Sequence, residues 1–300
     1  MVKNRKRIVS IDLLRVLAII MVIGFHFFYQ FDQNQSLRKI GFLGISLFFI
    51  ISGFVLAKIY PKHEKFSLRW FLKRYSRIAV LYYLALISVV ILFGKQVYSG
   101  SLMNNLLFHF AFLDPFTKYA YGIISPAWFL TPLIGLYILF PYLNKYLKKS
   151  TWILVIPFII MIALRIYKGT YTGYSPLFFL GEFCFGIAFA NGKKHLALFI
   201  SLLSMIVQPF MVIPYFIFYI LYSINGNYLP GRLLSFIGAY TLPLFLFHEG
   251  YLRIIFGRWH IYNLNQFGAM FLLTIVVFVC IYIDKIIQKL LSKVKYIQKL

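Results

Sequence analysis

Long uninterrupted runs of hydrophobic residues dominate the pattern along the chain. Ten of them are long enough, or nearly so, to cross a hydrocarbon core as helices of about 20 residues. They cover residues 8–29, 40–58, 78–95, 127–145, 151–168, 174–191, 195–211, 212–225, 233–252 and 267–290. Because the runs do not alternate apolar with polar positions, they exclude a transmembrane β-barrel. The pattern therefore predicts an all-α, polytopic transmembrane helix bundle of about ten spans.

Two parts of the pattern do not fit a plain series of spans. Segment 96–126 holds only a short apolar run before Asp114 and Pro115, so we expect it to lie on the outer face or to dip in partway. The division between the seventh and eighth spans, at Met211, depends on two prolines that interrupt one apolar block. About ten residues follow the last span, so we expect one integral membrane domain, 1–300, without a soluble domain.

The charge of the chain orients these spans. The 31 Lys and Arg residues outnumber the 7 Asp and Glu residues, for a net charge of +24, and most lie between the apolar runs. With both termini placed in the cytoplasm, 22 basic residues lie on the cytoplasmic side and 8 on the other. This predicts a multi-pass protein of the cell membrane with both termini inside. An anionic lipid leaflet, rather than nucleic acid, is the expected partner, and one anionic substrate remains compatible with it.

Several common chemistries have no signal in the sequence. The two cysteines, Cys184 and Cys280, lie inside apolar runs, which favours packing over metal binding or a disulfide framework. There is no metal-ligand spacing, no Walker-type phosphate loop and no Gly-x-Ser-x-Gly nucleophile elbow. We therefore expect no metal and no permanently bound cofactor.

The first span contains three ionisable residues, and these are costly inside a membrane. Asp12 and Arg15 are three residues apart and can face each other on one helical turn. His26 follows Arg15 by eleven residues, close to three full turns, so both lie on nearly the same face about 16 Å apart. Two readings remain open: a catalytic or binding face, or an arginine that snorkels to lipid phosphate and a histidine satisfied within the bundle.

A second basic pair precedes the third span. Arg74 and Arg77 are three apart at its cytoplasmic start, where the helix dipole also favours anions. Paired guanidinium groups suit phosphate bidentately, although ordinary positive-inside topology also explains the pair.

Other polar positions carry weaker signals. Glu182 lies inside the sixth span, and His248 lies near the outer end of the ninth. The remaining histidines are expected to have no special role; they are His63, His109, His195 and His260. Small residues of the second span, Gly44, Ser46 and Gly53, are expected to allow close helix packing.

Together these stretches resemble the membrane-bound acyltransferase family 3, which includes O-acetyltransferases of bacterial surface polysaccharides. The resemblance rests on four segments: Ile11 to Arg15 with His26, which fits an Arg-x10-His pattern; Phe48 to Phe54; Arg74 to Arg77, which fits Arg-x-x-Arg; and Trp128 to Leu130 leading to Pro141. Each segment alone is weakly specific, whereas their order covers nearly the whole chain.

The resemblance implies a cytoplasmic acyl-CoA donor and an acceptor hydroxyl on a glycan or lipid-linked glycan of a bacterial cell envelope. It implies that His26 is the catalytic base, that Arg15 also belongs to the catalytic group, and that Arg74 and Arg77 contact acyl-CoA. Supporting positions are Asp12, Ser52, Trp128, Glu182 and His248. We expect this chain to lack the hydrolase-like domain that some members append.

The sequence thus predicts transfer of an acyl group, acetyl being the expected one, from acyl-CoA to a glycan hydroxyl. A neutral imidazole can take the hydroxyl proton and return it to the leaving thiolate. The alternatives are a transporter or flippase for a lipid-linked sugar, and a membrane scaffold, which would leave the buried charges unexplained. The sequence specifies neither the acceptor, the acyl chain, the oxyanion donor nor the oligomeric state.

Overall fold

The computed structural model describes residues 8–31, 35–94, 102–117, 123–169, 173–224, 229–261 and 264–293. All regular structure within these ranges is helical. The first basic cluster, Lys3 to Arg7, and the last two lysines, Lys295 and Lys299, lie outside the described residues. The all-α prediction is confirmed for the part of the chain that the structure covers.

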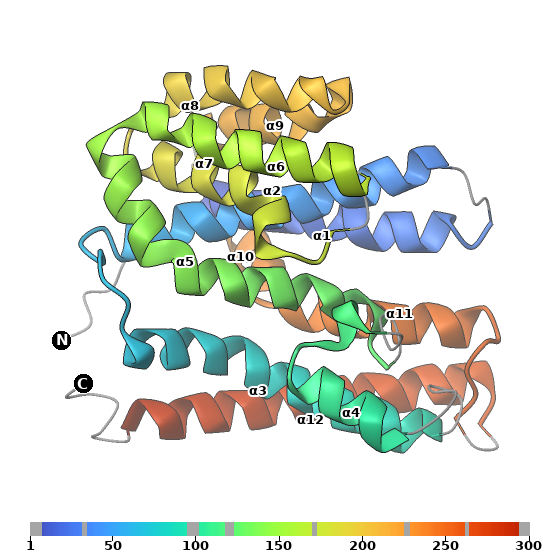
Figure 1. Ribbon diagram of the computed structural model, residues 1–300. Helices are drawn as coiled ribbons and strands as arrows, with labels where there is room; N and C mark the ends of the chain where they lie inside the picture. Colours follow the sequence, from blue (N-terminus) through green and yellow to red (C-terminus); the bar gives the residue numbers. More distant parts are fainter. Residues whose placement is uncertain are drawn as a thin grey trace. The chain divides into compact units, whose positions relative to one another are not determined.

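Most of the helices coincide with apolar runs of the sequence, and Figure 1 shows these helices. They are α1 (Val9–Phe28), α2 (Gln35–Ile59), α3 (Leu68–Phe93), α4 (Leu102–Phe110), α5 (Leu130–Lys149), α6 (Val155–Lys168), α7 (Leu180–Ala190), α8 (Lys194–Ser201), α9 (Ile213–Ser223), α10 (Gly231–Ala239), α11 (Thr241–Ile255) and α12 (Gln266–Lys293). Short 3-10 turns accompany them: η2 (Asp114–Phe116), η3 (Ser125–Phe129), η4 (Thr151–Leu154), η5 (Pro176–Phe179), η6 (Leu202–Ile206) and η7 (Pro209–Val212).

The number of spans differs from the predicted ten. Among the described residues, six helical segments are long and apolar enough to cross a membrane, and the bent pair α10–α11 could provide a seventh. The other three predicted spans correspond to shorter apolar helices, over Pro176–Ala190, Lys194–Ile206 and Pro209–Ser223. These are shorter than the roughly 20 residues that a full crossing requires. The count of ten and the orientation are therefore not confirmed.

Two boundaries were predicted wrongly. The third span begins at Leu68 rather than 78, because Ser67 caps the helix by accepting a hydrogen bond from the Trp70 N–H (3.4 Å). Long basic side chains in its first turns can reach water from a helix start, so their charge does not end the helix. The break between the seventh and eighth segments falls at 207–208, before Pro209, and not at Met211, which lies inside η7.

The chain forms two compact units. The first contains Met1–Glu64, Tyr142–Gly173 and Leu177–Thr241, and the second contains Lys65–Pro141, Tyr174–Pro176 and Leu242–Leu300. In the first unit, α2 packs against α1, α7 and α9. A side chain at Gly53 would collide with the Phe183 carbonyl of α7, and one at Gly44 would collide with the Ala18 carbonyl of α1. The small residues of α2 thus allow the close helix packing that the sequence predicted.

In the second unit, α3 and α12 lie side by side and run antiparallel (Figure 1). The Ser88 hydroxyl lies 3.2 Å from the Cys280 sulfur, and Phe93 packs on Trp259 with ring centroids 4.4 Å apart. Both cysteines of the chain are buried in helices, as expected for packing residues.

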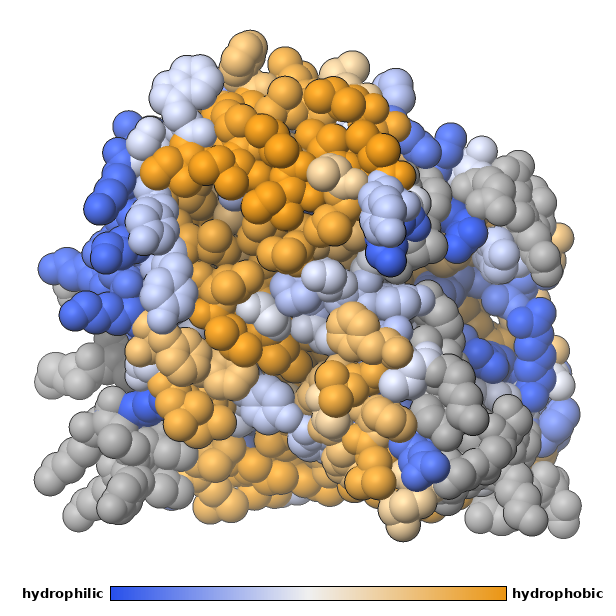
Figure 2. All heavy atoms as spheres, in the orientation of Figure 1, coloured by the Kyte–Doolittle hydropathy of each residue, from blue (hydrophilic) through white to orange (hydrophobic). Residues whose placement is uncertain are grey.

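Hydrophobic side chains also cover outward-facing surfaces of the helices. Figure 2 shows them over α6 and α8 of the first unit, where Ile159, Ile166 and Phe199 are more than half exposed. Exposed apolar surface of this extent is typical of helices that face lipid.

Candidate functional site

The N-terminal half of α1 holds a carboxylate and a guanidinium in contact. Asp12 is 1% exposed and accepts a hydrogen bond from Arg15 Nη1 at 3.3 Å. It also accepts one from the Ser235 hydroxyl of α10 at 3.0 Å, and Gly238 of α10 lies against its side chain. Of the roles open to Arg15 in the sequence, pairing with Asp12 is the one that this geometry displays. The carboxylate therefore fixes the position of the arginine.

His26 lies in the last turn of the same helix, two residues before its end at Phe28. Its side chain is half-buried, and its ring packs beside Phe25 with centroids 4.7 Å apart. The Gln30 side chain donates a hydrogen bond to the His26 carbonyl at 2.9 Å, which caps this end of α1. If the N-terminus is cytoplasmic, as the basic residues predict, the imidazole lies at the outer end of the span. Arg15 and His26 thus occupy opposite ends of α1.

The two arginines of α3 differ in their surroundings. Arg77 is exposed and lines a groove of about 930 Å³ between the start of α3 and the end of α12. Arg69 and Lys73 line the same groove, whereas Arg74 is half-buried and lies outside its lining. The arginine pair belongs to the second unit and the α1 residues to the first.

Glu182 belongs to a buried ion pair that the sequence did not reveal. Its Oε1 lies 2.5 Å from Nη2 of Arg165 on α6, and both side chains are 1% exposed. The Ser46 hydroxyl donates to the same oxygen at 3.3 Å, and the Phe178 carbonyl accepts from Arg165 at 3.0 Å. Arg165 is one of the 8 basic residues that the topology prediction places on the side opposite the cytoplasm. The signal available was its position inside an apolar helix, because a charge there requires a partner.

Three other predicted positions make local contacts. The Ser52 hydroxyl donates to the Phe48 carbonyl at 2.7 Å, within α2. His248, which is buried in α11, donates through Nδ1 to the Phe245 carbonyl at 2.8 Å. Trp128 in η3 packs edge-on against Tyr174, with ring centroids 5.7 Å apart.

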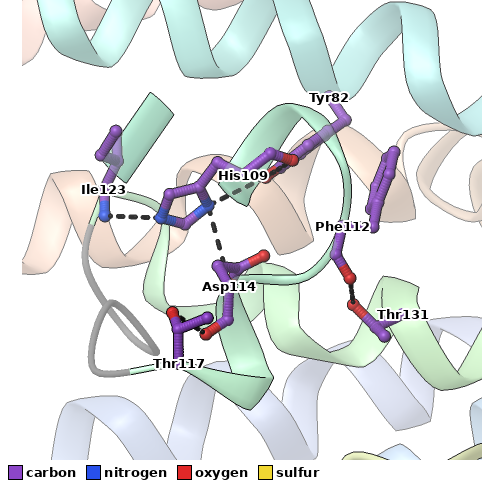
Figure 3. A network of polar contacts seen from close by, with 7 residues as sticks. All are labelled: Tyr82, His109, Phe112, Asp114, Thr117, Ile123 and Thr131. Atoms are coloured by element: carbon purple, nitrogen blue, oxygen red, sulfur yellow. Dashed lines mark hydrogen bonds and ion pairs between the residues drawn. The ribbon is translucent and has the colours of Figure 1, made fainter. Parts of the chain in front are cut away.

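A second polar cluster, in the second unit, surrounds His109, for which the sequence predicted no role (Figure 3). The Ile123 N–H donates to Nε2 of His109 at 3.2 Å, so Nε2 is the unprotonated nitrogen and Nδ1 carries the proton. Nδ1 lies 3.0 Å from the Tyr82 hydroxyl, which donates to the His109 carbonyl at 3.2 Å. An imidazole whose basic nitrogen is occupied by a backbone amide is a structural clamp rather than a catalytic base.

Asp114 completes this cluster. Its side chain is 2% exposed, and its Oδ2 lies 3.6 Å from Nδ1 of His109. Burial raises the pKa of Asp114 to about 7 and lowers the pKa of His109 to about 4. Near neutral pH the pair therefore binds at most one titratable proton, and this proton is on the Asp114 carboxyl.

The backbone between these two residues is shaped to bring them together. Phe112 has φ 55°, and the Leu113 N–H donates to the Phe108 carbonyl at 2.9 Å, as in a Schellman motif. Glycine is usual at such a position, so the phenylalanine costs on the order of 1–3 kcal/mol. Its ring packs on Tyr82 at 4.7 Å and its carbonyl accepts from Thr131 at 2.8 Å, and these contacts hold the turn in place (Figure 3).

Within the described residues, no group of three or more His, Cys, Asp or Glu side chains could hold a metal ion. The site residues offer acid–base and anion-binding chemistry: an imidazole in the last turn of α1, a carboxylate-held arginine in its N-terminal half, and a basic groove on α3.

Comparison with known proteins identifies the family of the chain. The model of the family described as an acyltransferase domain, acyltransferase family 3, matches residues 8–227. Over 93 residues, which are 29% of this chain, the sequence is 36% identical to the peptidoglycan O-acetyltransferase OatA of Listeria monocytogenes. The matched region spans 14% of that relative's length. No solved structure matches the chain.

Proposed function

Because the chain belongs to acyltransferase family 3, we propose that it transfers an acetyl group from cytoplasmic acetyl-CoA to a hydroxyl of a bacterial cell-envelope glycan or its lipid-linked precursor. The observation that carries the proposal is the arrangement on α1, inside the matched region. There a half-buried imidazole and an arginine held by a buried carboxylate lie about three turns apart on one helix face.

His26 is the proposed general base. A sugar hydroxyl is a weak nucleophile until its proton is removed, and an imidazole titrates near neutral pH. His26 takes this proton as the hydroxyl oxygen attacks the thioester carbonyl. The carbon–sulfur bond then breaks, and the imidazolium returns the proton to the leaving thiolate of coenzyme A. The step needs no further reactant, because the proton taken from the hydroxyl is the one given to the thiolate and the acetyl group moves from sulfur to oxygen.

Arg15 is the proposed anchor at the other end of α1. Asp12 and Ser235 hold its guanidinium in one orientation, which lowers the entropy lost when it contacts a ligand. A positioned cation could orient a donor phosphate or line the route along which the acyl group reaches His26. Arg74 and Arg77 are proposed to contact donor phosphate, since guanidinium groups bind phosphate bidentately.

The acceptor proposal follows the relative's name. That protein is a peptidoglycan O-acetyltransferase, and a glycan hydroxyl of the same envelope is the simplest acceptor here. The proposed location is the cell membrane of a bacterium. A transporter or flippase without chemistry is not favoured, because the family match is to acyltransferases.

The test is transfer of label by purified protein in vesicles. Acetyl-CoA labelled in the acetyl group would be supplied with peptidoglycan fragments or candidate surface glycans. The wild type should label the glycan, and His26→Gln should reduce the rate by roughly 10²–10⁴-fold, since an amide cannot carry the proton.

The matched control is His260→Gln, the same substitution at an exposed histidine. It should leave transfer unchanged. Undiminished labelling by His26→Gln at equal protein would refute the base assignment, and no labelling of any glycan by the wild type would refute the enzymatic proposal.

A further inference from the structure

A tight turn follows α2 directly, and we call its residues, 60–63, the α2–α3 turn. The His63 N–H donates to the Tyr60 carbonyl at 3.1 Å, and Pro61 lies at the second position of the turn, where its fixed φ is favoured. A turn leaves backbone carbonyls without partners in a helix or a sheet. Where it packs against other elements, these carbonyls require donors from those elements.

Asn144 of α5 supplies such donors. Its side chain is fully buried, and its Nδ2 lies 3.5 Å from the carbonyl of Tyr60, 3.3 Å from that of Pro61 and 3.2 Å from that of His63. Because all three neighbours are acceptors, the nitrogen of the amide rather than its oxygen must face them. One buried side chain thus holds three of the four residues of the α2–α3 turn.

Two more side chains on the same side of α5 extend this contact. Lys148, one turn after Asn144, lies 3.0 Å from Glu64, the residue that follows the α2–α3 turn. Phe140, one turn before Asn144, stacks on Trp70 in the first turn of α3, with ring centroids 5.5 Å apart. Phe140, Asn144 and Lys148 therefore form a row at intervals of four residues, which we call the α5 row.

The chain held by the α5 row leads into the basic start of α3. Arg74 and Arg77, the proposed contacts for donor phosphate, follow in the first turns of this helix. A loose connecting segment would let the start of α3 take many positions, and the entropy lost on fixing it would lower donor affinity. Holding the segment before the donor arrives removes much of that cost.

We propose that Asn144 and Lys148 are positioning residues for the acyl-CoA donor, because they hold the segment that precedes the phosphate-binding arginines. Neither residue contacts the reacting atoms in this proposal, so they affect donor affinity and not the rate of the chemical step. Asn144 contributes more, since Lys148 and Glu64 are 29% and 43% exposed and such ion pairs contribute little. The inference rests on the proposed function for the identity of the donor.

The principal test variant is Asn144→Asp, which keeps the shape of the side chain and replaces its donor nitrogen with an oxygen. A carboxylate cannot donate to the three carbonyls, so the α2–α3 turn should detach from α5. Lys148→Met is the second variant, and its partly exposed position should tolerate the change. The matched control is Lys149→Met, which removes the next lysine of α5, an exposed residue that lies over the Tyr146 ring.

The first readout is limited digestion of purified full-length protein by trypsin in a neutral detergent, with the fragments identified by mass spectrometry. Lys62 and Lys65 are exposed cleavage sites in the held segment, and cleavage there requires the segment to open locally. Asn144→Asp should be cut at these sites roughly tenfold faster than the wild type, since lost hydrogen bonds of about 1.4 kcal/mol correspond to that factor. Lys149→Met should match the wild type.

The second readout is the affinity for coenzyme A, measured by titration, together with kcat for glycan acetylation at saturating acetyl-CoA. Asn144→Asp should weaken coenzyme A binding by roughly tenfold and leave kcat unchanged. Lys148→Met should weaken it by a smaller factor, up to about fivefold. A purely structural defect would instead lower the amount of folded protein without changing the affinity of the folded fraction.

Two results would overturn the proposal. One is equal cleavage at Lys62 and Lys65 in Asn144→Asp and the control, which would mean that Asn144 does not hold the turn. The other is faster cleavage with unchanged affinity for coenzyme A, which would separate the turn from the donor. If the wild type bound no coenzyme A, the proposed donor would be refuted and the positioning role with it, whereas the cleavage rates would still show whether the turn is held.

Discussion

Replacing Asp114 with asparagine should change how the free energy of unfolding depends on pH. In the wild type Asp114 and His109 make opposite contributions to this dependence, because burial raises the pKa of Asp114 and lowers the pKa of His109. In the unfolded chain their ordinary pKa values are 3.8 and 6.5, so between pH 4 and 6.5 one proton is bound, on the histidine. In the native protein the pKa of Asp114 is about 7 and that of His109 about 4, so one proton is bound there too, on the carboxyl.

Equal proton counts make the contribution of the pair to stability nearly independent of pH in this window. In Asp114→Asn only His109 remains, and its pKa is lower in the native state. The stability it contributes is complete above pH 6.5 and is lost as the pH falls toward 4. The difference of about 2.5 units between 6.5 and about 4 corresponds to ~3 kcal/mol at 1.36 kcal/mol per unit.

The converse variant, His109→Gln, leaves Asp114, whose pKa is higher in the native state. Its contribution is complete below pH 3.8 and is lost as the pH rises through about 7. The difference of about 3 units corresponds to ~4 kcal/mol. The two variants should therefore depend on pH in opposite directions.

The assay is thermal unfolding in detergent micelles between pH 4 and 7.5, with each variant compared with the wild type so that shared titrations cancel. A change of 3 kcal/mol corresponds to a shift of roughly 6–12 °C in Tm for a chain of this order of size. If Tm depended on pH in the same way in Asp114→Asn and in the wild type, the reasoning would be refuted. The Asp114 carboxyl would then bind no proton in the native protein in this pH range.

Three further outcomes are expected. Arg165→Met or Glu182→Gln alone should destabilise the protein by about 3–5 kcal/mol, because each single change leaves a buried charge without its partner. The double variant should lose less. If the two losses in Tm were additive in the double variant, the ion pair would be contradicted. Arg74→Ala with Arg77→Ala should weaken coenzyme A binding in a titration while the protein still inserts, and unchanged affinity would leave the pair a purely topological role. A reporter fused after the last residue should be cytoplasmic, whereas an external signal would overturn the predicted orientation.

The sequence by itself determined the helical class and the local geometry of α1. Continuous apolar runs leave the backbone no partner but itself in lipid, so the predicted segments had to be helices. The period of 3.6 residues places Arg15 and His26 on one face, and a spacing of three brings Asp12 to Arg15, as observed at 3.3 Å. Such features depend only on a single helix, whose geometry is known in advance.

Tertiary structure decided everything that joins different helices. Glu182 contacts Arg165, which is 17 positions away in the sequence, and Tyr82 contacts His109, which is 27 positions away. Periodicity indicates which face of a helix is apolar but not which helix covers it, so neither pair could be predicted. The division of the later apolar runs into short or bent helices was equally out of reach, since it depends on packing around prolines rather than on hydropathy. The groove between α3 and α12 exists only because two distant segments pack together, with Gln288 bonded to Ser76 across 212 positions, which no local pattern encodes.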